Sequence, residues 1–192
     1  MKVNACRAVK KMNAHAGGEN HLSSAPCVRI LGVDASLRST GFGLIEARAQ
    51  RISAVEFGVV KSPGAWPLSR CLARLQNEFA EIIERTGPDV AAIEGVFFCR
   101  NVRTAVALGE ARGVIIASCA VRGIPVHEYS PRRVKQAVVG FGGADKRQVA
   151  MMVVGLLNLA ATPKEDAADA LAVAISHAHS KKMNELQGIR AV

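Results

Sequence analysis

The chain has 192 residues, of which 49% are hydrophobic and 21% charged, and its formal net charge is +9. This composition is typical of a globular domain with a sizeable core and excludes a disordered chain, and no apolar run approaches the roughly 20 residues that cross a bilayer. The excess of positive charge suits a polyanionic partner, although many basic proteins bind none.

The first ordered segment is expected to begin at Val28. Residues 1–27 are basic, rich in Gly, Asn and Ser, and without periodicity, so we expect a disordered extension, either a leader upstream of the native start or a tail that touches DNA. Runs rich in β-branched or alternating residues then predict three strands, at 28–33, 42–47 and 52–61. The short turns between them favour antiparallel pairing.

Helical spacing begins after residue 67. An apolar stripe predicts a helix at 68–85, which Gly87-Pro88 ends. The pattern then predicts strands at 89–94 and 124–129, helices at 101–122, 145–157 and 165–179, and a flexible tail at 181–192. This order predicts one α/β domain over residues 28–180. Its sheet would be mixed and five-stranded, three antiparallel strands followed by two parallel ones, and flanked by helices.

Two carboxylates directly follow apolar strands. Asp34 follows the strand at 28–33, and Glu94 ends the strand at 89–94. Ligand sites in open α/β sheets gather at the carboxyl ends of the strands, so both residues are candidates for a functional site. Taken singly, each is better explained as a turn aspartate or an exposed strand-end glutamate.

Two further acids, Asp166 and Asp169, lie three residues apart at the start of the last helix. This spacing places them on one helix face, with Cβ atoms roughly 5–6 Å apart. Helix capping explains Asp166 by itself, but the residues around Asp169 are Ala and Leu, which suit a buried face. The pair therefore indicates more than a helix start.

Four gathered acids require a cation, because like charges raise one another's pKa. Hard ions such as Mg²⁺ take oxygen ligands, and two of them about 3.5–4 Å apart promote phosphodiester hydrolysis. No nucleophile-elbow or Walker A sequence competes with this interpretation, and the cysteines lack zinc-ligand spacing and indicate reduced thiols in the cytoplasm. His127, His177 and His179 are candidate bases or plain structural residues. We predict a metal-dependent DNA endonuclease.

Several stretches of the chain, in order, resemble the RuvC family of Holliday-junction resolvases. They are ILGVD at 30–34 followed by TG at 40–41, AIE at 92–94 followed by VFF at 96–98, LGEARG at 108–113, VKQAVVG at 134–140, Lys146 within ADKRQV at 144–149, and DAADALA at 166–172. The resemblance covers about residues 28–180, and it is the combination of motifs that is specific. It implies an RNase H-like fold and a homodimer in which each subunit nicks one of two strands of like polarity at a four-way DNA junction.

The resemblance also implies roles for individual residues. Asp34, Glu94, Asp166 and Asp169 would form the catalytic centre and bind Mg²⁺, two ions per site, with Mn²⁺ able to substitute. Lys135 and Lys146 would contact phosphate, Phe97 would wedge against bases at the crossover, and Arg112 would contact DNA. The RuvA-RuvB branch-migration complex would be a partner. Spacing alone favours a solvated surface for the two lysines, and we expect one of Phe97 and Phe98 to be a packing residue.

The chain departs from the family at two positions. Ala35-Ser36 stands where relatives usually have Pro-Gly, and Gly95 follows Glu94 where a larger polar residue is common. A glycine can take a positive φ, so the conformation of Ser36 decides whether the first turn is affected. Both changes leave the four acids intact.

Three other functions are compatible with parts of the pattern. An RNase H-like nuclease acting on another branched or hybrid nucleic acid would use the same acids. A protein that binds junctions with weak catalysis is the second, because of Ala35-Ser36. An actin-like kinase also opens with a strand and an Asp, but it needs two lobes, which the short chain does not provide.

Overall fold

The computed structural model describes residues 26–95 and 101–187. Three long strands come first, β1 (Cys27–Asp34), β2 (Ser39–Arg48) and β3 (Arg51–Lys61), and they pair antiparallel in chain order. The connections are short, since Asp34 pairs with Gly41 and Arg48 with Arg51. The prediction of three antiparallel strands is confirmed.

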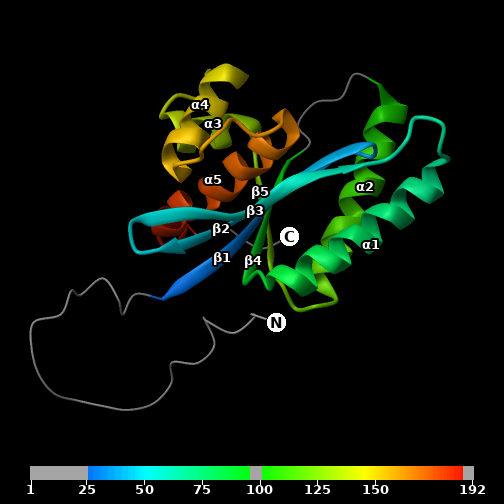
Figure 1. Cartoon of the computed structure of the whole chain (residues 1–192), viewed down its shortest axis with the longest axis horizontal. Helices are drawn as coiled ribbons and strands as arrows, with labels where there is room; N and C mark the ends of the chain where they lie inside the picture. The colour runs from blue at the N-terminus through cyan, green and yellow to red at the C-terminus, as the bar shows by residue number, and fades with distance from the viewer. Residues whose placement is uncertain (1–25, 96–100, 188–192) are drawn as a thin grey trace, which may run out of the picture.

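The two remaining strands lie on the other side of β1. β4 (Val90–Glu94) runs parallel to β1, and β5 (Val126–Tyr129) runs parallel to β4, so the strand order is β3-β2-β1-β4-β5 (Figure 1). Because β1, β4 and β5 point the same way, their carboxyl ends share one edge of the sheet. The predicted mixed five-stranded sheet is confirmed.

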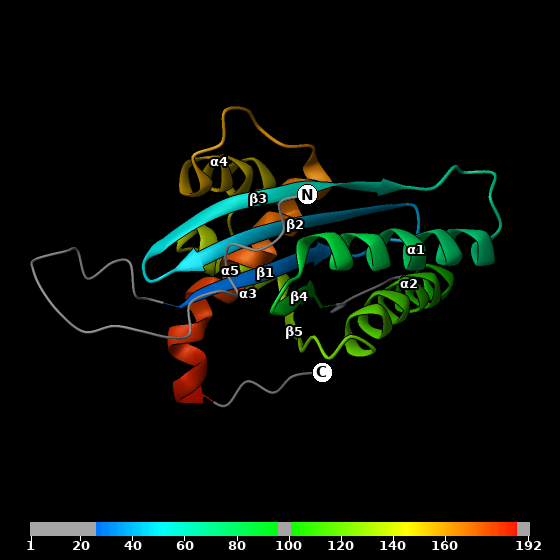
Figure 2. The same ribbon diagram turned by 60° about the horizontal axis from the view of Figure 1, so that its bottom comes forward.

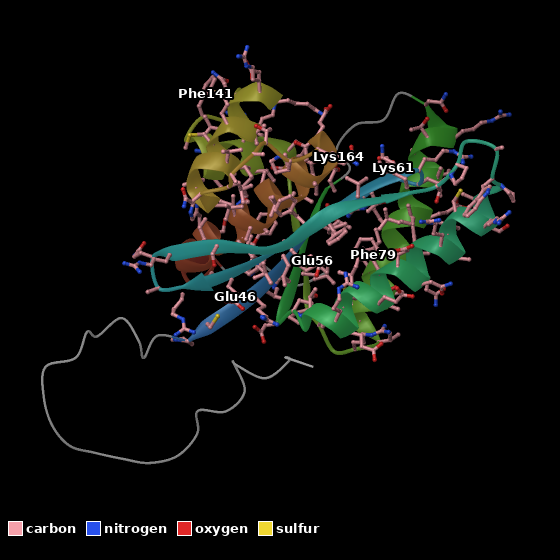
Figure 3. The ribbon with its side chains drawn as sticks, viewed as in Figure 1. Glu46, Glu56, Lys61, Phe79, Phe141 and Lys164 are labelled. Atoms are coloured by element: carbon pink, nitrogen blue, oxygen red, sulfur yellow. The ribbon has the colours of Figure 1, made fainter. Side chains whose placement is uncertain are left out.

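Two helices, α1 (Leu68–Thr86) and α2 (Val102–Ala120), cover one face of the sheet (Figure 2). The apolar stripe of α1 is buried against the strands, and Phe79 on this stripe is completely buried (Figure 3). α1 ends at Gly87, whose φ of 55° is the left-handed conformation that glycine adopts without strain. The helices predicted at 68–85 and 101–122 are therefore present with slightly different ends.

The other face carries α3 (Pro131–Val139), α4 (Lys146–Leu157) and α5 (Glu165–Gln187), which lie opposite α1 and α2 in Figure 1. These helices build a second apolar cluster with the sheet, which contains Ile30 and Ile45 from the strands and Leu171 and Ile175 from α5. α5 is the helix that carries the two aspartates of the DAADALA motif. Its packing against the sheet therefore decides where these acids lie.

Helix α3 is the one element that the periodicity does not predict. It has nine residues, and only Val134 and Val138 are buried, so its apolar stripe is too short to stand out. Its start was nevertheless readable, because Ser130 caps the Arg133 N–H and Pro131 occupies the first turn. These capping signals are the ones that could have found it.

The expected extension at 1–27 lies outside the described residues apart from its last two positions, and β1 begins at Cys27. The expected tail at 181–192 overlaps α5 as far as Gln187, and residues 188–192 lie outside the description. Within the described part, no helix is long and apolar enough to cross a membrane.

Candidate active site

Asp34 and Glu94 lie next to each other at the shared edge of the sheet. Val33 pairs with Ile93 in the parallel register of β1 and β4, so the acids that follow them end neighbouring strands. Both carboxylates are half-buried. The expectation that two strand ends bring these acids together therefore agrees with the geometry.

Helix α5 brings the other two acids to the same place because glycines let it approach the strands. A Cβ atom on Gly41, the register partner of Asp34, would overlap the backbone carbonyl of Asp166. A Cβ on Gly32 would come within 2.7 Å of the Ala174 N–H nitrogen. The small residues on both elements thus place the start of α5 directly over the end of β1.

Ser39 is a site residue that sequence reasoning missed. Its hydroxyl, at the first position of β2, donates a hydrogen bond to the Asp166 carboxylate. No spacing pattern links two residues so far apart in the chain. The only sequence signal was a hydroxyl residue in the turn after Asp34.

Lys146 lies beside the acids, where Glu165 and Asp169 form ion pairs with it. Its ammonium group is 2.6 Å from the Glu165 carboxylate and 3.4 Å from that of Asp169. These acids, Glu165 first, raise the pKa of Lys146, so it remains charged. The Asp145 capping box, closed by Gln148, fixes the start of α4 from which Lys146 projects.

The electrostatics of the site are those of crowded like charges. Burial first, and then the charges of Glu94, Asp169 and Asp166, raise the pKa of Asp34 from 3.8 to about 7. Burial also raises the pKa of Glu94 and of Asp169, with Asp169 contributing to the shift of Glu94. The three acids named with Asp34 are therefore close enough to repel it.

Lysines oppose this repulsion. The positive charges of Lys146 and then Lys135 lower the pKa of Glu94 against the larger effect of its burial. Lys135 projects from α3, so this short helix has a part in the site. The structure thus brings both predicted lysines toward the acids.

The donor set fits a hard divalent cation, because its members are carboxylate oxygens held together at an electrostatic cost that a cation would relieve. Among the residues described, no three His, Cys, Asp or Glu side chains already converge as a closed metal-binding group. Mg²⁺ retains several waters and needs only one or two direct carboxylates, so a looser arrangement suits it. The set would not favour a thiolate- or imidazole-bound metal.

The turn after Asp34 does not need the glycine that relatives usually carry. In the described chain, the non-glycine residues with positive φ are Ala49 and Asn158, so Ser36 takes an ordinary backbone conformation. Buried Thr40 braces this turn, since its hydroxyl donates to the Ser36 carbonyl and accepts from the Ser36 N–H. Ala35-Ser36 is therefore compatible with the turn.

Arg112 does not face a DNA surface as expected. It is only 8% exposed, and its guanidinium donates to the Glu94 backbone carbonyl and to the Glu128 carboxylate, the latter at 2.5 Å. Both ends of the guanidinium are thus engaged inside the protein. The expected wedge residue, Phe97, lies outside the described residues, as does Phe98.

The histidines that were candidate bases have structural environments. His177 is buried and shares a 2.8 Å hydrogen bond with the Tyr129 hydroxyl, while His179 Nδ1 is 2.9 Å from the Ala137 carbonyl. Burial lowers the pKa of His127. These contacts favour the structural interpretation of His177 and His179.

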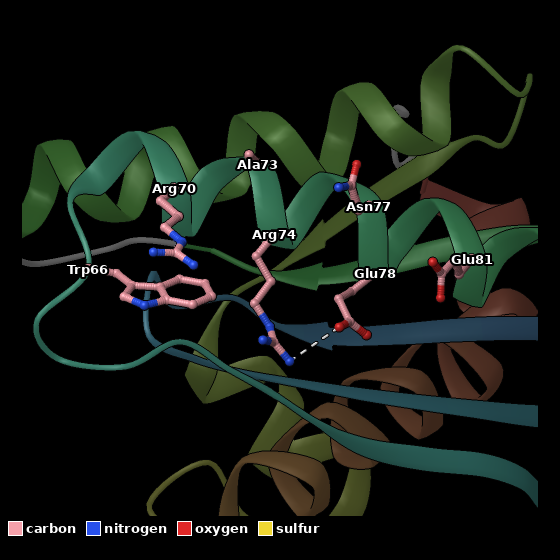
Figure 4. A pocket seen from close by; sticks show the side chains of 7 residues that line it. All are labelled: Trp66, Arg70, Ala73, Arg74, Asn77, Glu78 and Glu81. Carbon is pink, nitrogen blue, oxygen red and sulfur yellow. Dashed lines mark ion pairs between the residues drawn. The ribbon is translucent and has the colours of Figure 1, made fainter.

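A surface pocket on α1 is separate from the four acids. It is lined by Trp66, Arg70, Ala73, Arg74, Asn77, Glu78 and Glu81 (Figure 4). The Arg70 guanidinium lies 3.8 Å from the centre of the Trp66 ring, and Arg74 pairs with Glu78 at 3.3 Å. Its lining thus mixes both signs of charge, with Arg70 stacked on Trp66 and Arg74 paired with Glu78.

Comparison with known proteins identifies the family. The model of the family described as crossover junction endodeoxyribonuclease RuvC matches residues 30–177. The chain belongs to the RuvC family. RuvC of Chloroflexus aurantiacus is 47% identical over 154 residues, covering 80% of this chain and 94% of that protein. RuvC of Maricaulis maris is 47% identical over 159 residues, covering 83% of this chain and 95% of that protein.

A solved RuvC structure has the same fold. T. thermophilus RuvC in complex with a Holliday junction substrate matches with a TM-score of 0.80 and 31% identity, covering 86% of this chain and 99% of that chain. The predicted RuvC membership, the RNase H-like α/β fold and the enzyme class of crossover junction endodeoxyribonuclease are confirmed. RuvC proteins are metal-dependent nucleases, and the kinase alternative is set aside.

Proposed function

We propose that this chain resolves four-way DNA junctions by Mg²⁺-dependent nicking of two strands of like polarity, in DNA recombination and repair in the cytoplasm. The observation that carries the proposal is Asp34, a half-buried acid whose pKa is raised to about 7 by burial and by three neighbouring acids. Clusters of acids with strongly raised pKa values are typical of functional sites, and a bound cation would relieve their mutual repulsion. The junction as substrate follows from family membership and from the relative solved in complex with one.

In this proposal Asp34, Glu94, Asp166 and Asp169 hold the metal, two Mg²⁺ per site, with Mn²⁺ able to substitute. When bound, the metal supplies an activated water and stabilises the leaving 3′-oxygen. The paired ends of β1 and β4 fix the positions of Asp34 and Glu94, which bind metal in their ionised form. The hydrogen bond from Ser39 orients Asp166. Lys146 would exchange its pairing with Glu165 for a phosphate, and Lys135 would contact phosphate from α3.

Base contacts are assigned to Phe97 by resemblance alone. It follows Glu94 by three residues in the sequence. An aromatic ring that stacks on an unpaired base contributes about 1–3 kcal/mol to binding. Such stacking requires a base to leave its stack, which is easier at the crossover of a four-way junction, where the helix is interrupted, than within a linear duplex.

Paired nicking requires two sites, and we assign the homodimer interface to the outer surface of α2. Val102 and Val106 are 77% and 54% exposed there, and their spacing of four residues places them on one face of the helix. A Val106→Glu variant is expected to be monomeric in sedimentation experiments and to nick without symmetry. The RuvA-RuvB branch-migration complex is the further partner that family membership suggests.

The test uses a synthetic four-way junction and a linear duplex, each with Mg²⁺ or with EDTA. Wild type should cut the junction only with Mg²⁺, and Asp34→Asn should bind but not cut it. Asp89→Asn is the matched control, because Asp89 lies just before the first residue of β4, at the end of the strand opposite Glu94. An uncut junction would select the catalytically weak binding protein, and equal cutting of the linear duplex would select the broader nuclease.

A further inference from the structure

Arg112 connects three elements at the edge of the sheet where the acids gather. It lies on α2, and its guanidinium reaches the backbone carbonyl of Glu94, the last residue of β4, and the carboxylate of Glu128 in β5. Since β4 and β5 pair side by side, one side chain holds both strand ends to the helix layer. Glu94 is the acid whose backbone this contact fixes.

Burying the Arg112 guanidinium costs free energy, and its hydrogen bonds require a defined geometry. The Arg112 side chain is only 10% exposed, while that of Glu128 is 37% exposed. A guanidinium removed from water needs its donors satisfied, so its position depends on both partners being present. Its planar fork gives directional bonds that a lysine cannot reproduce.

On the carboxyl side of Glu94, the described chain continues only to Gly95 before the gap at 96–100. Gly95 follows directly, and its N–H donates to the Tyr129 carbonyl at 2.8 Å, which extends the β4–β5 pairing by one residue. Glycine adds backbone freedom at that position. The Arg112 contact on the Glu94 carbonyl thus complements this single backbone bond.

We propose that Arg112 and Glu128 are a positioning pair that fixes the end of β4 and so places the Glu94 carboxylate in the metal site. This role rests on the proposed function and replaces the expected contact of Arg112 with DNA. Neither residue touches substrate or metal. Loss of the pair moves Glu94 and weakens metal binding, while the DNA surface is unaffected.

The chain contains a matched control at the opposite end of the sheet. Arg29 Nε lies 2.9 Å from the Glu46 carboxylate, and its Nη1 lies 2.7 Å from the Thr86 carbonyl. This arginine also bridges a carboxylate and a backbone carbonyl, but it lies at the amino end of β1. Arg29→Gln therefore reports the cost of breaking such a bridge away from the acids.

The experiment measures Mn²⁺ binding to the metal-free full chain by electron paramagnetic resonance, and junction binding in EDTA. Arg112→Gln and Glu128→Gln should each weaken Mn²⁺ binding about tenfold and leave junction binding unchanged. The double variant should be no worse than either single one. Arg29→Gln should lower the melting temperature without changing Mn²⁺ affinity.

If Arg112→Gln does not fold, Arg112→Lys provides a variant that retains the positive charge. Its loss of Mn²⁺ affinity should be intermediate, because a lysine can reach only one of the two partners. If the Arg112 and Glu128 variants bind Mn²⁺ as tightly as Arg29→Gln does, the positioning role is wrong, although the metal site itself is not contradicted. Weaker junction binding with unchanged Mn²⁺ affinity would also overturn it and make Arg112 a DNA contact. Asp34→Asn with wild-type Mn²⁺ binding would instead refute the metal site itself.

Discussion

The hydroxyl of Ser39 donates a hydrogen bond to the carboxylate of Asp166, a residue 127 positions later in the chain. The bond joins the start of β2 to the first turn of α5, above the end of β1. It uses one oxygen of Asp166 and so limits the orientations of the other. A proposed metal ligand is therefore oriented by a residue that belongs to none of the family motifs.

We expect Ser39→Ala to weaken Mg²⁺ binding about tenfold, because hydrogen bonds to a ligating carboxylate orient it toward the metal. The Mg²⁺ concentration for half-maximal junction cleavage measures this effect. Ser53→Ala, on the exposed surface of β3, is the control. An unchanged Mg²⁺ requirement in Ser39→Ala would show that the bond has no such role.

The stability of the metal-free protein should depend on pH through Asp34. Burial first, then neighbouring acids, raise its pKa from 3.8 to about 7 in the folded state. Between these values the folded chain holds a proton that the unfolded chain has released. The contribution of Asp34 to the free energy of unfolding therefore falls as the pH rises through this window.

Thermal unfolding in EDTA at about pH 5 and about pH 8 tests this expectation. Asp34→Asn lacks the titrating group, so its melting temperature relative to wild type should rise between the two pH values. Mg²⁺ binds ionised carboxylates and should restore wild-type stability at the higher pH. A difference between the two proteins that stays constant with pH would contradict the assignment.

Gly41→Ala should destabilise the fold by at least about 1–3 kcal/mol, because the added Cβ overlaps the Asp166 backbone. Gly155→Ala is the contrasting change, since a Cβ there meets nothing within 4 Å on helix α4. It should stabilise the protein by about 1 kcal/mol through helix propensity. Urea unfolding measures both, and equal effects of the two changes would contradict the close packing of α5.

Replacing Ser36 with the residue usual in relatives should not help this chain. Ser36 has no positive φ, so Ser36→Gly adds only freedom to the unfolded state and should cost about 0.5–1 kcal/mol of stability. Junction cleavage should remain at or below the wild-type rate. A gain in activity would mean that the turn requires a backbone conformation that serine adopts poorly.

Lys61 is expected to contact DNA phosphate beside the site. It ends β3 directly opposite Ser39 and is exposed (Figure 3). Lys61→Ala should reduce the slope of log affinity against log salt concentration for junction binding by about 0.9. Arg51→Ala, at the other end of β3, should leave that slope unchanged. Equal slopes for both variants would remove Lys61 from the DNA surface.

Within residues 26–95 and 101–187, the sequence was sufficient to predict every strand and every helix except α3, because burial imposes its period on each strand and long helix. It also predicted which acids end strands and which share a helix face. Asp34 and Glu94 are local features of apolar runs, and Asp166 and Asp169 are three residues apart. Such relations depend only on the geometry of one element.

Tertiary structure alone decided how the elements meet. The approach of α5 to Gly41, the bond of Ser39 to Asp166 and the engagement of Arg112 by Glu128 each join segments that no period connects. Arg112 illustrates the difference, since its motif suggested DNA while its burial directs it to Glu94. A residue's type and spacing determine what it can bind, but its partner is set by packing, which depends on the whole chain.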